Sequence, residues 1–184
     1  MESLRTGRLT LRDLTAHDFA TVHAYASDPA VTRYMNWGPN TEQDTRGFIA
    51  RALNQQAQTP RTHYTLGVCL EDGSLIGGCG LHVTDESSKE GFIGYVLNKT
   101  YWGKGHATEI ARALLQFGFG TMGLRRIWTT CDTYNVASRR VLEKAGMRRE
   151  GLLEKDNCKD GAWRDSYLYA ALAGDIVEEP SVRP

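Results

Sequence analysis

Two glycines, Gly103 and Gly105, stand where an apolar run from Phe92 to Leu97 gives way to a segment with helical periodicity. Glycines at a strand-to-helix turn let consecutive backbone N–H groups point outward at the positive end of the helix dipole. The turn therefore predicts an anion site, and a phosphate is the expected anion. His106 and Ala107 follow Gly105, whereas a Walker loop needs Lys then Ser or Thr there, and a dinucleotide-binding loop needs a third glycine. Both of those phosphate motifs are disfavoured.

A second informative segment begins at Asn135. Asparagine at a helix N-cap accepts a hydrogen bond from a backbone N–H of the first turn, and glycine just past the last helical residue is typical of a helix end. Asn135 and Gly146 occupy these positions and predict a helix from Asn135 to Ala145. Ser138 then lies in the first turn of this helix.

Together the two segments resemble the GNAT superfamily of acyl-CoA-dependent N-acetyltransferases. Within it, the chain looks most like the branch that acetylates the alanine or serine N-termini of ribosomal proteins. The resemblance runs from the Thr6–Arg12 segment to the region of Trp163. It is carried by Gly103–Ala107 and by Asn135, Ser138, Val141, Leu142, Gly146 and Met147.

The resemblance implies an α/β (α+β) fold of the GNAT type. Its centre is a mixed, mostly antiparallel sheet of about seven strands, flanked by helices. Strands around Gly91–Leu97 and Arg126–Cys131 are expected to splay apart, and the pantetheine arm of acetyl-CoA is expected in the cleft between them. Unpaired backbone groups of the splayed strands can then bond the pantetheine amides.

Acetyl-CoA is accordingly the expected cosubstrate, with no metal. Trp102 stands where the family often has Gln or Arg, a departure that should matter little because the loop binds through its backbone. The residues expected to hold the cosubstrate are Tyr95, Val96, Leu97, Trp102, Gly103, Lys104, Gly105, His106, Ala107, Thr108, Asn135 and Ser138.

Acetyl transfer to an amine needs a neutral nucleophile, an oxyanion donor and a proton for the departing thiolate. The resemblance places the oxyanion donor at the backbone N–H of Leu97 and the general acid at Ser138. Tyr134 is the rival acid. A serine three residues after an N-cap is also common for purely local reasons, and a tyrosine there can simply cover the core.

The general base is where this chain departs from the family pattern. The resemblance leads to acidic residues at about Phe92 and Asn157, and neither is acidic. Glu154 and Asp156 are nearby but read better as exposed hairpin charges. An α-amine with a pKa of ~8 is neutral far more often at pH 7 than a lysine at ~10.4. A site without a strong base therefore favours peptide N-termini or amino sugars over lysine side chains. His82 and His106 lie closest to the expected cleft, and lone histidines are more often structural.

The bulk composition excludes several functions. Lys plus Arg equals Asp plus Glu at 22 each, so no net field attracts nucleic acid or an anionic membrane. The four cysteines lack metal-ligand or C-x-x-C spacing and read as reduced. No signal segment or long apolar run is apparent, which predicts a cytoplasmic protein.

Hydrophobic periodicity predicts one domain over residues 1–174 and a loose tail over 175–184. The sequence does not reveal whether the protein is a monomer or a homodimer. The expected strands, besides one through Leu9 and Leu11, are Tyr64–Leu70, Leu75–Val83, Gly91–Leu97, Arg126–Cys131, Met147–Lys155 and Arg164–Leu172. The expected helices are Thr15–Ser27, Thr41 to about Gln58, Gly105–Phe119 and Asn135–Ala145.

The sequence thus predicts an acetyl-CoA-dependent N-acetyltransferase that works by direct attack in a ternary complex, with a protein N-terminus as one acceptor. A small amine, an amino sugar or an antibiotic is the alternative acceptor. The missing acidic positions leave a third hypothesis, a non-catalytic acyl-CoA-binding module.

Overall fold

The computed structural model describes residues 2–175 and contains one eight-stranded sheet with the order β1-β2-β3-β4-β5-β6-β8-β7. The strands are β1 Leu4–Arg5, β2 Leu9–Asp13, β3 His63–Leu70, β4 Leu75–Asp85, β5 Glu90–Leu97, β6 Arg126–Asp132, β7 Arg148–Lys159 and β8 Ala162–Leu172. The α-helices are α1 Phe19–Ala26, α2 Pro29–Thr32, α3 Glu42–Gln56, α4 His106–Gln116 and α5 Val136–Lys144. Short helical turns η1 Ala16–Asp18, η2 Lys99–Tyr101 and η3 Phe117–Thr121 complete the elements.

The expected α/β sheet is confirmed, with eight strands instead of about seven. The additional strand is β1, which spans two residues and is too short to leave an alternating pattern. Every neighbouring pair is antiparallel except β5 and β6, which are parallel. The sheet is therefore mixed and mostly antiparallel, as the family resemblance implies.

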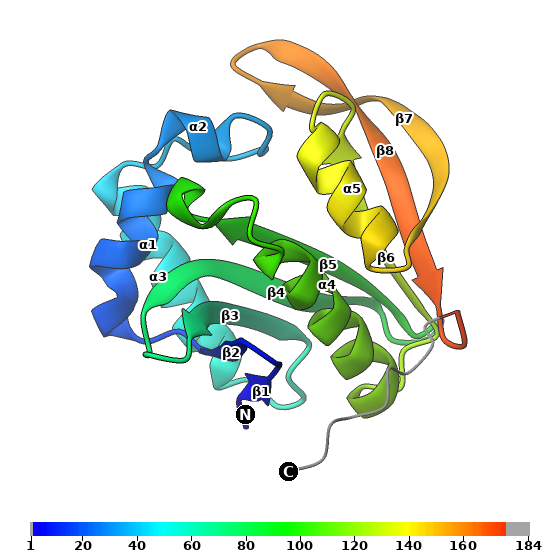
Figure 1. The fold of residues 1–184 in the computed structure, drawn as a ribbon, viewed down its shortest axis with the longest axis horizontal. Coiled ribbons are helices and arrows are strands. Elements are labelled where there is room, and N and C mark those ends of the chain that lie inside the picture. The colour runs from blue at the N-terminus through cyan, green and yellow to red at the C-terminus, as the bar shows by residue number, and fades with distance from the viewer. Residues whose placement is uncertain (1, 176–184) are drawn as a thin grey trace.

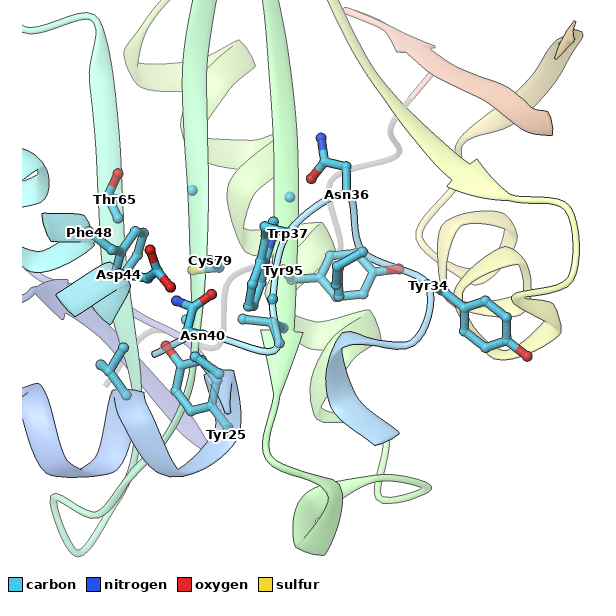
Figure 2. A pocket seen from close by; sticks show the side chains of 18 of the residues that line it. Tyr25, Tyr34, Asn36, Trp37, Asn40, Asp44, Phe48, Thr65, Cys79 and Tyr95 are labelled. Atoms are coloured by element: carbon cyan, nitrogen blue, oxygen red, sulfur yellow. The ribbon is translucent and has the colours of Figure 1, made fainter. Parts of the chain in front are cut away.

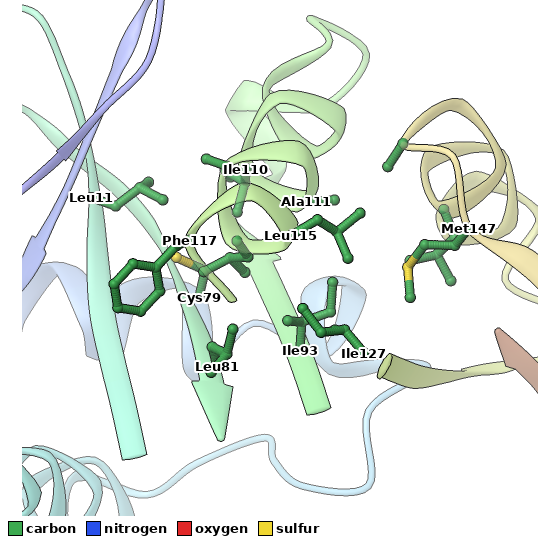
Figure 3. Packing of buried hydrophobic residues seen from close by; sticks show 14 of the residues in the cluster. Leu11, Cys79, Leu81, Ile93, Ile110, Ala111, Leu115, Phe117, Ile127 and Met147 are labelled. Atoms are coloured by element: carbon green, nitrogen blue, oxygen red, sulfur yellow. The ribbon is translucent and has the colours of Figure 1, made fainter. Parts of the chain in front are cut away.

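Helices cover both faces of the sheet (Figure 1). On one face, α4 and α5 pack over the central strands. Figure 3 shows the apolar stripe of α4, with Ile110, Ala111 and Leu115, lying over Leu81 and Ile93 of the strands. All five of these side chains are fully buried. Helix α4 carries apolar residues three and four positions apart, so one stripe faces the sheet along its whole length.

On the opposite face, α1 and α3 enclose a second apolar cluster that includes Val22, Tyr25 and Ile49. The predicted helix from Thr15 begins later, because Asp18 accepts hydrogen bonds from the backbone N–H and hydroxyl of Thr15 and closes a 3₁₀ turn first. Helix α1 ends before Asp28, as predicted, but Asp28 also caps α2, a one-turn helix that the sequence pattern did not reveal.

The central parallel pair separates after three residues. Pairing between β5 and β6 covers Glu90 with Arg126 through Phe92 with Trp128 and then stops. Strand β6 continues to pair with β8 along its whole length. The carboxyl-terminal halves of β5 and β6 therefore diverge, which confirms the expected splay.

The described residues include no helix that is long and apolar enough to cross a membrane. The cytoplasmic location stays a prediction. Of the predicted tail, residues 176–184 lie outside the described residues.

Candidate active site

A cavity of about 920 Å³ opens where β5 and β6 diverge. Its walls come from α1, α3, the segment between α2 and α3, and strands β4 to β6. In Figure 2, Tyr25, Asn40, Asp44 and Phe48 gather on the side of α1 and α3, and Trp37 lies over the strands. The cavity also reaches the start of α5. Sequence segments far apart thus meet at the point where the sheet is unpaired.

Backbone groups of β5 point into the cleft. The N–H of Asn98 donates to the Ile76 carbonyl of β4 at 2.9 Å. Because hydrogen-bonded and non-hydrogen-bonded pairs alternate along an antiparallel ladder, the N–H groups of Tyr95 and Leu97 are directed away from β4, toward β6. No β6 residue pairs with either. Leu97, the predicted oxyanion donor, therefore has its N–H on the cleft side, between Val96 and Asn98, whose N–H groups point to β4.

The glycine loop has the backbone that an anion site needs. Gly103 and Gly105 have φ of +74° and +83°, a region that glycine adopts without strain. Gly105 is the N-cap of α4. Arg8, at the edge of β2, fixes this turn: its guanidinium donates to the Lys104 carbonyl at 3.0 Å and to Glu109 of α4 at 2.8 Å. The sequence pattern did not indicate that Arg8 would form hydrogen bonds to this loop.

The positive potential of the loop comes mainly from its backbone N–H groups. Burial, and then the positive charge of Arg8, lower the pKa of His106, so this imidazole is neutral. The Lys104 side chain is exposed and lies over the Tyr101 ring. Ala107 and Thr108 occupy the first turn of α4, where their N–H groups are free of intrahelical acceptors.

Trp102 has a structural partner. Its indole Nε1 donates to the Leu97 carbonyl at 2.8 Å, which ties the loop to the end of β5, while the side chain is 49% exposed. The bond leaves the N–H of Leu97 free.

Ser138 lies in the cleft, and its side chain contacts Tyr95 of β5. The Tyr95 hydroxyl is 2.9 Å from Ser138 Oγ. Burial raises the pKa of Tyr95 well above its usual value, so the phenol stays protonated. Asn135 caps α5 as predicted, since its Oδ1 accepts from the Ser138 N–H at 3.1 Å. Asn135, Ser138 and Tyr95 all line the cavity.

Tyr134, the rival acid, lies elsewhere. Its side chain is 77% exposed and is not part of the cavity wall. Its N–H donates to Asp132 Oδ1 at 2.8 Å, and Asp132 Oδ2 lies 3.6 Å from Arg164. The structure thus brings Ser138 into the cleft and leaves Tyr134 at the surface.

The positions expected to carry a base do face the cavity. Phe92 and Asn157 both line it, and Asn157 Nδ2 donates to Ser166 at 3.1 Å. Glu154 and Asp156 are exposed and do not line it. The exposed-charge interpretation of these two carboxylates therefore fits their placement.

The floor of the cavity is made of glycines. Gly80 pairs with Gly94, and Gly78 with Val96, so these residues share one face of β4 and β5. A Cβ on Gly80 would lie 2.8 Å from the Tyr64 carbonyl, which requires glycine there. His82 follows on the same face, in the cavity wall. Only the tertiary pairing shows that these glycines form a surface.

Among residues 2–175, no group of three or more His, Cys, Asp or Glu side chains is placed to hold a metal ion.

Known proteins share this arrangement. A family model described as the acetyltransferase (GNAT) domain matches residues 8–148. YnaD of Bacillus subtilis, described as an uncharacterized N-acetyltransferase, is 36% identical over 169 residues, which are 92% of this chain and 96% of that protein. A GNAT-family acetyltransferase structure from Bacillus anthracis has a TM-score of 0.83 at 36% identity and covers 94% of this chain and 99% of its own. RimJ of Mycobacterium smegmatis, in complex with CoA-disulfide, has a TM-score of 0.81 at 26% identity, covering 91% and 83%.

The family resemblance seen in the sequence is thus confirmed. The family model covers well over half of the chain, and the relatives match it nearly from end to end. This protein belongs to the GNAT family and is an acetyltransferase.

Proposed function

We propose that this acetyltransferase moves acetyl from acetyl-CoA directly to a primary amine while both are bound. The divergence of β5 and β6 carries the proposal, because it leaves the N–H groups of Tyr95 and Leu97 free at the end of a strand that leads into the glycine loop. Free N–H groups on a strand that leads into an anion-binding loop suit the pantetheine arm of CoA, whose amides lead to a pyrophosphate. RimJ, a structural relative, was solved with a CoA-disulfide.

The residues present fit this cosubstrate. The amides of Gly103 to Thr108 would hold the pyrophosphate at the N-terminus of α4. The N–H groups of Tyr95 and Leu97 would bond the pantetheine and the thioester oxygen. A thioester bound there supplies an activated acyl carbon, and an N–H aimed at its oxygen stabilises the negative charge that develops in attack.

Ser138 would deliver a proton to the departing sulfur. Its hydroxyl is hydrogen-bonded to the Tyr95 hydroxyl, so a proton given up by Ser138 can be replaced from Tyr95. The amine nitrogen bonds the acyl carbon, the C–S bond breaks with its electron pair on sulfur, and the sulfur takes the Ser138 proton. No acyl-enzyme is formed.

The cavity walls indicate the class of acceptor. Aromatic rings of Tyr25, Trp37, Phe48 and Phe92 surround the glycine floor. Among the described residues, the carboxylates lining the cavity are Asp44 and Asp132, and each already accepts hydrogen bonds from its own neighbourhood. A polyamine or an aminoglycoside brings several ammonium groups that would need more carboxylates. We infer that the acceptor carries one amine on a small, largely apolar body.

A protein N-terminus is the second candidate acceptor. It rests on the resemblance of the loop and the α5 pattern to the N-terminal-acetylating branch, and on the single amine that a peptide N-terminus offers. The lower pKa of an α-amine also favours this candidate, because the neutral amine is the nucleophile.

Thiol release from acetyl-CoA tests these assignments. The acceptors would be tyramine, benzylamine and tryptamine, peptides beginning with Ala or Ser, and spermidine and kanamycin, with CoA binding measured by calorimetry. Higher kcat/KM for the aromatic monoamines is the expected result. Preference for the peptides would replace our acceptor by the second candidate. Tight CoA binding with no turnover would support the third hypothesis, a non-catalytic acyl-CoA-binding module.

We also propose that residues 1–174 form a single domain. The continuous sheet from β1 to β8 and the apolar clusters on its two faces support this assignment.

A further inference from the structure

We propose that the imidazole of His82 takes the proton from the attacking amine. This inference rests on the proposed function and assigns the general base, which neither the family model nor the sequence pattern identified. The group lies on β4, one strand away from the strand that faces the thioester.

The position of His82 follows from the pairing of β4 and β5. His82 pairs with Phe92, Gly80 with Gly94, and all four share the face toward the cavity. The His82 Nε2 lies 3.2 Å from where a Cβ of Gly80 would stand, so the ring leans over the glycine floor. Gly94 is the residue before Tyr95. No side chain of these two glycines separates the His82 ring from the part of β5 whose N–H groups enter the cleft. The proposal places the amine on this floor, between His82 and the acyl carbon.

The ring nitrogens of His82 are available. Within the part of the chain that the structure describes, neither nitrogen has a hydrogen-bond partner, and neither belongs to the fully buried side-chain atoms that lack one. The ring is held by edge contacts to His63, at 4.8 Å between centroids, and to Phe92, at 6.4 Å. Apolar and edge-on contacts fix the orientation of a ring without occupying its nitrogens.

The surroundings keep His82 neutral. Burial lowers its pKa, and the neighbouring His63 of β3 lowers it further. From α3, the charged groups that line the same cavity are Asp44 and Arg51, and from β6 it is Asp132. A neutral imidazole accepts a proton at physiological pH, and a depressed pKa keeps it unprotonated there.

The carboxylates of the cavity already have partners. The Thr41 side chain and backbone both donate to Asp44, which lowers its pKa. Asp132 accepts from the Tyr134 N–H and lies 3.6 Å from the Arg164 guanidinium. Asp44 is stabilised as an anion, and the proton affinity of a stabilised anion is low. Asp132 already has two partners, the Tyr134 N–H and Arg164. His82 has no such partner.

The proton balance closes with Ser138. The amine loses one N–H proton to His82 as its nitrogen bonds the acyl carbon, and the sulfur gains one proton from Ser138. Solvent then removes the proton from His82 and returns one to the Tyr95–Ser138 pair. No oxidant, reductant or further reactant is needed.

The first test compares the pH dependence of wild type and His82→Asn with tyramine as acceptor, from about pH 5 to about pH 9. In wild type, the plot of log kcat/KM against pH is one unit steeper below the His82 pKa than above it. His82→Asn should lose about 10²-fold in kcat/KM and show no such break, with CoA affinity unchanged. A variant that keeps the break, or stays within about threefold of wild type, overturns the proposal.

Two further variants distinguish the loss of a base in His82→Asn from a loss of activity caused by altered structure. In the His82→Asn background, Phe92→Glu places a carboxylate beside the vacated site and should recover at least about tenfold in kcat/KM. His63→Asn is the matched control, because His63 contacts His82 but does not line the cavity. It should leave kcat/KM at high pH unchanged and move the break to higher pH. If His63→Asn costs as much as His82→Asn, or if Phe92→Glu restores nothing, the loss is structural and the proposal fails.

An NMR titration of the histidines uses the wild-type protein alone, so it does not depend on whether a variant folds. The His82 signal should titrate below about pH 6.5, at the pH of the kinetic break. A signal that titrates elsewhere contradicts the assignment. If wild type binds CoA but acetylates no amine of the panel, the proposed function itself fails. If it acetylates an amine and the break does not follow His82, only this inference fails.

Discussion

The Tyr95 hydroxyl lies 2.9 Å from Ser138 Oγ and links strand β5 to helix α5 across the opening of the sheet. The two residues come from segments 43 positions apart. Tyr95 is partly buried and packs against the core, and the bond holds Ser138 at the point where β5 and β6 have separated. Ser138 therefore has a hydroxyl partner that fixes its orientation, and α5 is linked to β5.

The first prediction concerns this pair. Ser138→Ala should lower kcat by about 10²-fold and leave CoA affinity within a few-fold, because it removes the proton donor and little binding surface. Tyr95→Phe should lower kcat less, since Ser138 remains. The double variant should cost no more than Ser138→Ala alone, because the two hydroxyls act as one unit.

Steady-state kinetics with calorimetry of CoA binding measures all three. Tyr134→Phe is the control and should behave as wild type, and a large loss in Tyr134→Phe with none in Ser138→Ala would reverse the assignment.

The second prediction concerns the glycine loop. Gly105→Glu should abolish CoA binding, since it puts a carboxylate and a strained φ at the N-cap of α4, where phosphate oxygens would sit. Gly123→Glu is matched, because Gly123 also has a positive φ, of +64°, and nothing within 4 Å of its Cβ position, but it lies at the far end of α4. Calorimetry should find near-normal CoA affinity for Gly123→Glu. Equal affinities of the two variants would remove the loop from the site.

The third prediction concerns the glycine floor. Gly94→Ala adds one methyl group at ordinary contact distance, 3.6 Å from Phe92, so the fold should tolerate it. Because the methyl group enters the acceptor space, KM for tyramine should rise about tenfold while CoA affinity stays within a few-fold. Gly151→Ala on β7, where nothing lies within 4 Å, is the control and should not change either constant. An unchanged KM in Gly94→Ala would place the acceptor elsewhere.

The fourth prediction concerns stability. Burial opposes ionisation of Asp18, but the bidentate bonds from Arg12 at 2.7 and 2.8 Å and those from Thr15 outweigh it, so its folded pKa is lowered. A depressed carboxylate pKa stabilises the fold above the unfolded value of about 3.9, and the gain is lost as pH falls through the folded pKa. Asp18→Asn should cost about 2 kcal/mol at pH 7, measured by urea unfolding. The difference from wild type should shrink below about pH 4, and a pH-independent difference would contradict this account.

Much of the architecture was readable along the chain. The predicted strands Tyr64–Leu70 and Leu75–Val83 and the predicted helix after Gly105 rest on local patterns, and the structure contains all three. The cap at Asn135 and the positive φ of Gly105 are equally local, because both depend on a residue and its near neighbours. Strand β1 and helix α2 escaped prediction because two and four residues are too few to show a period.

The groups that we propose for catalysis could be recognised only in the tertiary structure. In the sequence, His82 is an isolated histidine, Gly80 and Gly94 are separate strand glycines, and Tyr95 is one more apolar-strand residue. Strand register puts the first three on one face, and the packing of α5 on the sheet brings Ser138 to Tyr95. The sequence by itself determined the family, the glycine turn before α4 and the helix that carries Ser138, since these are short-range patterns. The tertiary structure alone decided which side chains share the cavity, because register and strand divergence join residues that the chain keeps far apart.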